Sequence, residues 1–117
     1  MKDFKNLQVW EKSHLLTLAI FMQTDNFPRS EIFGLTSQLR RAAAYVPTNI
    51  AEGCGRKSKK EFLYFLNVAF GSASELQYLI FLSFELNYLD QGQETQLSEK
   101  ISEIKRMLCS LIKIIEQ

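Results

Sequence analysis

Histidine, cysteine, proline and glycine are all scarce in this 117-residue chain, which contains one, two, two and five of them respectively. One histidine without a Cys-x-x-Cys pair offers no usual ligand set for zinc, and no dinucleotide or phosphate-loop glycine pattern occurs. Cys54 and Cys109 are too few for the disulfide framework of a small secreted domain. We therefore expect no metal, no cofactor and a cytoplasmic location.

Long uncharged runs are also absent. No stretch of about 18 residues lacks a charged side chain, so the sequence predicts no membrane-spanning helix. Neither sign of charge dominates, because 14 basic and 13 acidic residues leave a net charge of +1. Affinity for nucleic acid must then come from local charge. Hydrophobic residues make up 46% of the chain, which is enough for a folded core, and the length predicts one domain over residues 1–117.

Strand-like alternation is missing, and apolar residues recur at helical spacing in four segments. These segments cover residues 7–24, 30–52, 58–88 and 93–116. Four helices with short connections predict an all-α fold, an antiparallel up-and-down four-helix bundle. Pro47 lies inside the second segment, where it removes a backbone donor and crowds the carbonyl of Ala43. We expect a kinked second helix at this point. Asn49 and Glu52 are predicted to be structural residues, because they follow the kink, where freed carbonyls and the end of the helix need partners.

The third segment is apolar on several sides. One stripe contains Phe62, Leu66, Ala69, Ala73, Leu76, Ile80 and Phe84, and others contain Val68, Leu79, Leu82 and Leu86, or Leu63, Phe70, Phe81 and Tyr88. A helix of this kind needs cover on more than one face, and a bundle helix has only two neighbours. We therefore expect a homo-oligomer. The alternative is a central third helix with the amino-terminal segment lying over it.

Basic residues concentrate between residues 36 and 65, where six basic and two acidic groups give a net charge of +4. Four of the six crowd the start of the third helix, although the helix dipole makes positive charge unfavourable there. This placement predicts a phosphate-binding surface; the alternative is a solvated lysine-rich turn. The candidate nucleic-acid-binding residues are Arg40, Arg41, Arg56, Lys57, Lys59 and Lys60.

A row of polar and aromatic side chains lies beside the apolar stripe of the second helix: Gln38, Arg41, Tyr45, Asn49 and Glu52. We expect it to form a hydrogen-bond network between subunits; the alternative is the ordinary polar border of an amphipathic helix. Glu75 falls among apolar residues of the third segment, so we expect a buried carboxylate paired with an arginine of a neighbouring helix. The structural or interface candidates are Gln38, Tyr45, Asn49, Glu52 and Glu75.

Catalytic groups do not assemble in any recognisable pattern. The sequence shows no nucleophile–base pair and no carboxylate dyad, and one histidine leaves little for acid–base chemistry. An enzyme is therefore the least favoured class, and it would need a pocket around a perturbed Glu52 or Glu75.

The chain resembles a known family. The residues that carry the likeness are the run from Phe27 to Ala42, Asn49-Ile-Ala-Glu-Gly53 with Arg56, Phe4-x-x-Leu7-x-Val9-Trp10, and Gly71-Ser-x-x-Glu75-Leu76. They resemble the four-helix-bundle proteins encoded by intervening sequences within bacterial 23S ribosomal RNA genes. That family is similar to the accessory variability protein of diversity-generating retroelements, which binds nucleic acid and a reverse transcriptase.

The resemblance implies a ring-shaped homopentamer without enzymatic activity or cofactor, and RNA or DNA as a partner. The family tends to have a small residue where Tyr45 stands, so packing can differ there. Together with the residues, the resemblance favours a non-enzymatic, homo-oligomeric bundle that binds nucleic acid with low sequence specificity. The alternative is a protein-interaction scaffold whose ring surface holds a protein partner. Salt dependence distinguishes them, because phosphate contacts weaken steeply with salt.

Overall fold

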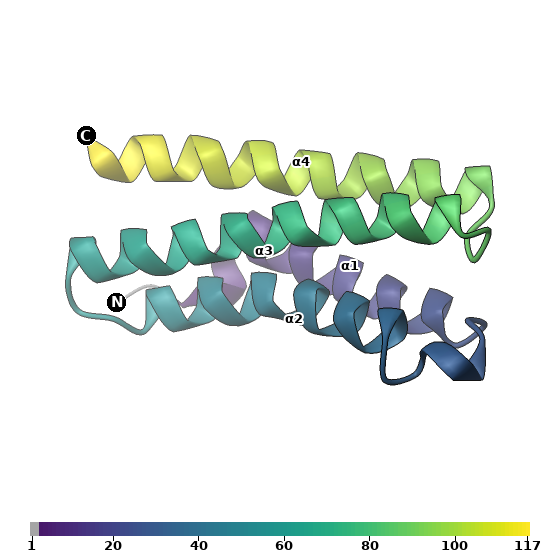
Figure 1. Cartoon of the computed structure of the whole chain (residues 1–117). Coiled ribbons are helices and arrows are strands. Elements are labelled where there is room, and N and C mark those ends of the chain that lie inside the picture. The colour runs from purple at the N-terminus through teal and green to yellow at the C-terminus, as the bar shows by residue number, and fades with distance from the viewer. Residues whose placement is uncertain (1–2) are drawn as a thin grey trace.

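Four long helices dominate the computed structural model, which describes residues 3–117; Met1 and Lys2 of the predicted domain lie outside the described residues. The helices are α1 (Gln8–Thr24), α2 (Leu35–Cys54), α3 (Lys59–Glu85) and α4 (Gln91–Glu116), with short 3-10 helices η1 (Phe4–Asn6) and η2 (Arg29–Glu31). Consecutive helices run in opposite directions (Figure 1), and residues 3–117 contain no strand. The predicted all-α, up-and-down four-helix bundle is confirmed.

The bundle closes around one core. α2 packs on α1 and α3, and α4 completes the ring by packing on α3 and α1. Every helix contributes fully buried aliphatic side chains, among them Leu16, Ile20, Leu39, Ile50, Leu66, Leu76, Ile80, Ile101, Ile104 and Leu108. The first apolar stripe of α3 therefore faces the core, because five of its seven residues, Leu66, Ala69, Ala73, Leu76 and Ile80, are buried.

The amino-terminal segment does not cover the remaining faces of α3. Within residues 3–117, η1 packs against α1 and α2 instead. Phe81 and Leu86, which belong to the two other apolar stripes, are 50% and 45% exposed. The single chain therefore leaves apolar surface of α3 open to solvent.

The start of α2 differs from the sequence prediction. We expected the helix from residue 30, but residues 29–31 form η2 and α2 begins only at Leu35. The backbone of Gly34 has φ −114° and ψ −113°, which lies outside the helical region and separates the two elements. The Oε1 atom of Glu31 accepts a hydrogen bond from the Leu35 amide at 3.1 Å. Glu31 therefore caps the first turn of α2, because Gly34 at the N-cap position has no side chain to do so.

The α3–α4 connection also differs from the prediction in its bounds. α3 ends at Glu85, and Asn87 adopts a left-handed conformation with φ 65°, which asparagine tolerates better than most residues. α4 begins at Gln91, two residues before the predicted start. The side chain of Asp90 accepts from the Gln93 amide, and the Gln93 side chain accepts from the Asp90 amide, so a complete capping box starts the helix.

Pro47 lies inside α2 without ending it, and the ribbon of α2 bends near its middle (Figure 1). A proline leaves the carbonyl four residues earlier without its helical donor, and here that carbonyl belongs to Ala43. The hydroxyl of Thr17 in α1 lies 3.0 Å from this oxygen and donates to it. Thr17 of α1, and neither Asn49 nor Glu52, therefore supplies the donor to this carbonyl. The structural role of Asn49 and Glu52 stays a prediction.

α3 is the one helix among the described residues with the length and apolar composition that a membrane span needs. The same composition occurs in central helices of soluble bundles, and α3 packs against both α2 and α4. Between residues 62 and 84 its single charged residue is Glu75.

Candidate nucleic-acid interface

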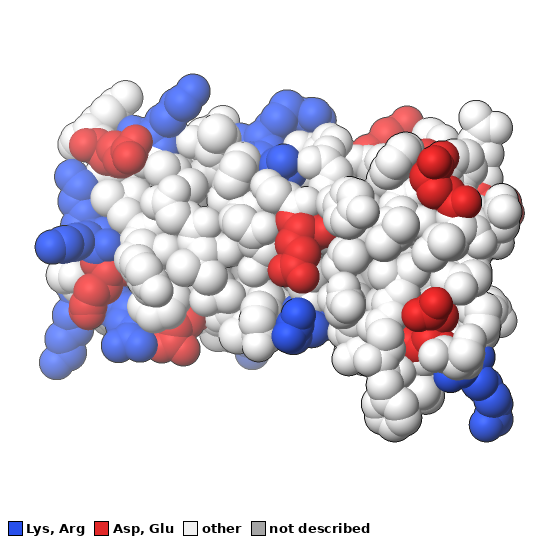
Figure 2. Space-filling model, in the orientation of Figure 1, with Lys and Arg blue, Asp and Glu red and all other residues white. Residues whose placement is uncertain are grey.

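Four basic residues gather at the turn between α2 and α3: Arg56, Lys57, Lys59 and Lys60, named here the lysine-rich turn. All four are exposed, and Figure 2 shows Lys and Arg side chains concentrated at the end of the molecule where α2 meets α3. The Ser58 hydroxyl accepts a hydrogen bond from the Glu61 amide at 3.0 Å and so fixes the start of α3 at Lys59. The lysines therefore stand at a well-defined helix N-terminus.

Gly53 allows the two helices to approach closely beside this turn. A Cβ atom at Gly53 would lie 3.0 Å from Cδ1 of Phe62 and 3.1 Å from Cβ of Phe65. The lack of a side chain thus lets the first turns of α3 pack directly on the last turn of α2. A hollow of about 150 Å³ lies next to this contact and is lined by Gly53, Cys54, Arg56, Lys57, Ser58, Lys59 and Phe62.

The charges of the lysine-rich turn are only partly compensated. The Nη2 atom of Arg56 lies 2.7 Å from Oε2 of Glu52, one helical turn earlier, and the guanidinium sits over the Phe65 ring at 4.9 Å. By contrast, Lys57, Lys59 and Lys60 form no ion pair within the part of the chain that the structure describes. Three of the four positive charges are therefore available to an external anion.

Arg40 does not belong to this surface. Its guanidinium donates to Thr24 Oγ1 at 2.8 Å and to Asp25 Oδ1 at 3.0 Å, and it lies over the Phe21 ring at 4.9 Å. These contacts hold Arg40 against the end of α1. It precedes Arg56 by sixteen residues, about 24 Å along a helix. The six predicted basic residues therefore do not form one patch.

Arg41 follows Arg40 in α2 but contacts α3. Its Nη2 atom is 3.9 Å from Oε2 of Glu75, so an arginine of a neighbouring helix does partner this carboxylate, as predicted. The predicted burial of Glu75 is wrong, since its side chain is 46% exposed. Apolar neighbours suggested a core position, but on α3 apolar residues also occupy the solvent side.

The polar row of α2 lies along the surface. Gln38 and Tyr45 are exposed, Asn49 donates from Nδ2 to the Tyr45 carbonyl at 2.8 Å, and Glu52 pairs with Arg56. These contacts stay within α2 and its C-terminal end. The role of this row in contacts between subunits stays a prediction.

Next to this row, α3 presents an apolar outer face, defined here by Tyr45 of α2 with Gly71, Tyr78 and Phe81 of α3. The two tyrosines are 48% and 58% exposed and Phe81 is 50% exposed, and uncharged atoms cover most of the centre of the side shown in Figure 2. Monomeric proteins seldom expose connected apolar patches of large size.

Tyr64 lies on α3 between the outer face and the lysine-rich turn, and it is 62% exposed. Sequence reasoning did not include it among the candidate residues. Its signal is the spacing of four residues from Lys60, which places both side chains on one side of the helix.

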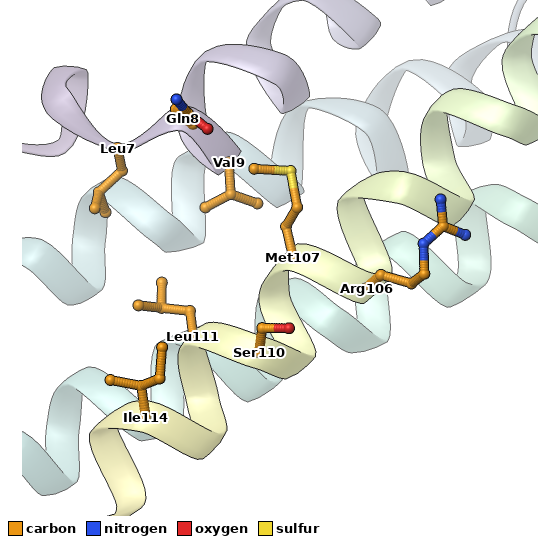
Figure 3. Close-up of a pocket in the computed structure, with 8 residues that line it drawn as sticks. All are labelled: Leu7, Gln8, Val9, Arg106, Met107, Ser110, Leu111 and Ile114. Carbon is orange, nitrogen blue, oxygen red and sulfur yellow. The ribbon is translucent and has the colours of Figure 1, made fainter.

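A second hollow, of about 360 Å³, lies between the start of α1 and the end of α4 (Figure 3). Its walls are mainly aliphatic, with Arg106 at one side, and it is lined by Leu7, Gln8, Val9, Arg106, Met107, Ser110, Leu111 and Ile114. No group of three His, Cys, Asp or Glu residues that could hold a metal ion occurs within residues 3–117.

The fold and the site define a class: a small four-helix bundle with a lysine-rich turn at one end and an apolar outer face. The family model of the 23S rRNA-intervening sequence protein matches residues 5–110, so the chain belongs to this family. It is similar to a solved protein of unknown function from the S23 ribosomal protein family of Bacteroides thetaiotaomicron, with 25% identity and a TM-score of 0.83. The match covers 90% of this chain and 95% of that chain. No curated protein matches.

Proposed function

We propose that this protein is a non-enzymatic, homo-oligomeric bundle of the cytoplasm that binds RNA or DNA through its lysine-rich turn. The observation that carries the proposal is the set of three lysines, Lys57, Lys59 and Lys60, that have no acidic partner in residues 3–117 and stand at the N-terminus of a long helix. The name of the family, which refers to ribosomal RNA, agrees with a nucleic-acid partner.

Phosphate is the anion that this surface fits best. The N-terminus of α3 carries the positive end of the helix dipole and amide groups that lack helical acceptors. Lysine charges, the dipole and the amides therefore all favour a negative group at the same place. Such contacts reach the backbone of a nucleic acid and not the edges of its bases, so they bind with low sequence specificity.

Association of several chains would strengthen this binding. We propose that the apolar outer face forms the contact between subunits, with the five-membered ring that the family resemblance implies. Burial of Tyr78 and Phe81 removes apolar surface from water, which is the main favourable term in association. A ring repeats the lysine-rich turn once per subunit, so contacts that are weak singly act together on one nucleic acid.

A salt titration tests the nucleic-acid proposal. Fluorescence anisotropy with labelled RNA and DNA compares the native chain with a variant in which Lys57, Lys59 and Lys60 are glutamine. For each phosphate that the variant no longer neutralises, the negative slope of log affinity against log salt should become less steep, by about 0.7 on single strands and about 0.9 on duplex DNA. The control changes Arg29, Lys100 and Arg106 to glutamine, because these residues are exposed and form no ion pair within residues 3–117.

Equal affinity of the native chain and the Lys57, Lys59 and Lys60 variant, or binding that ignores salt, would overturn the nucleic-acid proposal. The protein-interaction scaffold would then be the better function. An equally large drop in affinity in the control variant would also contradict it, since net charge alone would then explain the binding.

Light scattering coupled to size exclusion tests the assembly. We expect a particle several times the 13.6 kDa of one chain, and a smaller one when Tyr78 and Phe81 are both changed to lysine. Phe33→Lys is the control, because Phe33 is 96% exposed and lies outside the outer face. A native particle of 13.6 kDa at micromolar concentration contradicts the proposal.

A further inference from the structure

We propose that Tyr64 makes the lysine-rich turn selective for single-stranded nucleic acid, by stacking on an unpaired base while the lysines hold the adjoining phosphates. This inference rests on the proposed function and adds the substrate class to it.

Tyr64 stands one helical turn after Lys60. Residues four apart on a helix have Cβ atoms about 5–6 Å apart, so the ring and the ammonium group occupy one side of α3. More than half of Tyr64 is exposed, and its hydroxyl has no hydrogen-bond partner within residues 3–117. The core packing of the bundle therefore does not account for an aromatic ring at this position.

The ring is nevertheless held in place. It meets Phe65 edge to face, with centroids 5.0 Å apart and planes at 85°. Phe65 in turn lies under the guanidinium of Arg56, whose partner is Glu52. Tyr64 is therefore supported from the side of the lysine-rich turn, and a ring that is already ordered loses little conformational entropy when a base stacks on it.

Single strands and duplexes differ in whether the face of a base is free to stack on Tyr64. An unpaired base presents a free π face, and stacking on an aromatic side chain strengthens binding about 5- to 150-fold per base. In a duplex each base is already stacked and paired, so an aromatic ring gains this contact only after a base is extracted. The lysines bind the backbone of both, but Tyr64 adds affinity for single strands alone.

Tyr78 supplies a matched comparison. It is 58% exposed and lies fourteen residues after Tyr64, about 21 Å along the helix, where the nearby charges are the paired Arg41 and Glu75. A tyrosine of similar exposure on the same helix therefore lacks the free lysines that would hold a phosphate beside it.

The experiment uses the full chain and one labelled sequence, offered as single-stranded RNA, as single-stranded DNA and as duplex DNA at one salt concentration. Tyr64→Ala should weaken binding of both single strands about 5- to 150-fold and leave duplex binding within about two-fold. Tyr64→Phe and Tyr64→Trp should keep the preference, because both retain an aromatic face. Because Tyr78 belongs to the proposed subunit contact, Tyr78→Ala should lower the affinity for all three probes alike and leave the ratio of single-strand to duplex affinity unchanged. Light scattering checks the assembly of every variant.

The outcomes separate the two proposals. Equal binding of single strands and duplex by the native chain, or a Tyr64→Ala variant that retains native affinity for single strands, overturns the stacking inference and leaves the lysine contacts standing. Loss of the preference in Tyr64→Phe overturns it too, since the ring would then not be the group that acts. No salt-dependent binding to any of the three probes overturns the proposed function and this inference together.

Discussion

The hydroxyl of Thr17 in α1 donates a hydrogen bond to the carbonyl of Ala43 in α2, with 3.0 Å between the two oxygens. This carbonyl is the one that Pro47 leaves without a helical donor. Thr17 also lies 2.8 Å from the carbonyl of Ser13, so its single proton serves two acceptors. A residue thirty positions earlier in the chain thus accommodates the proline inside α2.

Thr17→Val should lower the free energy of unfolding by about 1–3 kcal/mol, because it leaves the Ala43 carbonyl without a partner while the shape of the side chain is kept. Thr17→Ser, which retains the hydroxyl, should cost less. Urea denaturation followed by circular dichroism measures both.

A double-mutant cycle identifies the cause. Pro47→Ala restores an amide that can bond to Ala43 within the helix, so Thr17→Val should cost less in that background than in the native chain. Identical costs in the two backgrounds would show that Thr17 stabilises the protein for some reason other than the freed carbonyl.

Gly53→Ala should destabilise the bundle by about 1–3 kcal/mol, the usual cost of overpacking. The new Cβ would meet Phe62 and Phe65 at 3.0 and 3.1 Å, and the Phe62 carbonyl at 3.3 Å. Thermal unfolding of the two proteins at equal concentration provides the measurement.

Gly92→Ala is the matched control, because the nearest atom to its Cβ is Oδ1 of Asp90, at an ordinary 3.4 Å. It should be neutral or stabilise α4 by up to about 0.5 kcal/mol, since alanine restricts the unfolded chain more than glycine does. If both substitutions change the stability equally, the close approach of α2 and α3 is not the reason that residue 53 must be glycine.

Tyr88 links the α3–α4 connection to η2, and its hydroxyl donates to Oε2 of Glu31 at 3.0 Å. This hydrogen bond, then desolvation and the charge of Glu31, raise the pKa of Tyr88 above its ordinary value of 10.0. Because the folded state holds the phenolic proton more tightly, the stabilisation is complete below the unfolded pKa. It is lost as the pH rises through the folded pKa.

Comparison with Tyr88→Phe isolates this contribution. As the pH rises through the unfolded pKa of tyrosine, near 10, and on toward the raised pKa of the folded state, the native protein should lose more stability than the variant. Below about pH 9 the difference between them should be constant. Urea midpoints over this range check the prediction, and parallel pH profiles for the two proteins would contradict it.

The fold could be predicted from the sequence because apolar residues recur at helical spacing in all four helices. Spacing did not identify the buried face of α1, where Leu18 and Met22 are exposed while Ser13 is buried. Local backbone choices were less accessible. Nothing in the spacing near Gly34 separates η2 from α2, and the early end of α3 depends on the left-handed Asn87. Hydrogen bonds to particular neighbours set both of these helix boundaries, as Glu31 does for Leu35. The spacing of apolar residues carries no information about such bonds.

The candidate site was predictable only in part. The concentration of lysines was visible as a run of charge, but charge counts cannot show which groups are already paired. Arg40 is held by Asp25 and Thr24 across a helix boundary, and Arg41 by Glu75, and these pairings depend on how helices face one another. Tyr64 was missed because it stands among apolar residues, and helical spacing alone does not show which aromatic rings of α3 are exposed.

The difference in length between α1 and α4 has a consequence for how the molecule opens. α1 has 17 residues and α4 has 26, and near the aliphatic hollow the last turns of α4 extend beyond the start of α1. There α4 keeps α3 as its main neighbour, and Ile114 is 66% exposed. Local opening follows the lowest density of buried contacts. Amide hydrogens at the C-terminal end of α4 will therefore exchange with solvent before those of α2 and of the middle of α3.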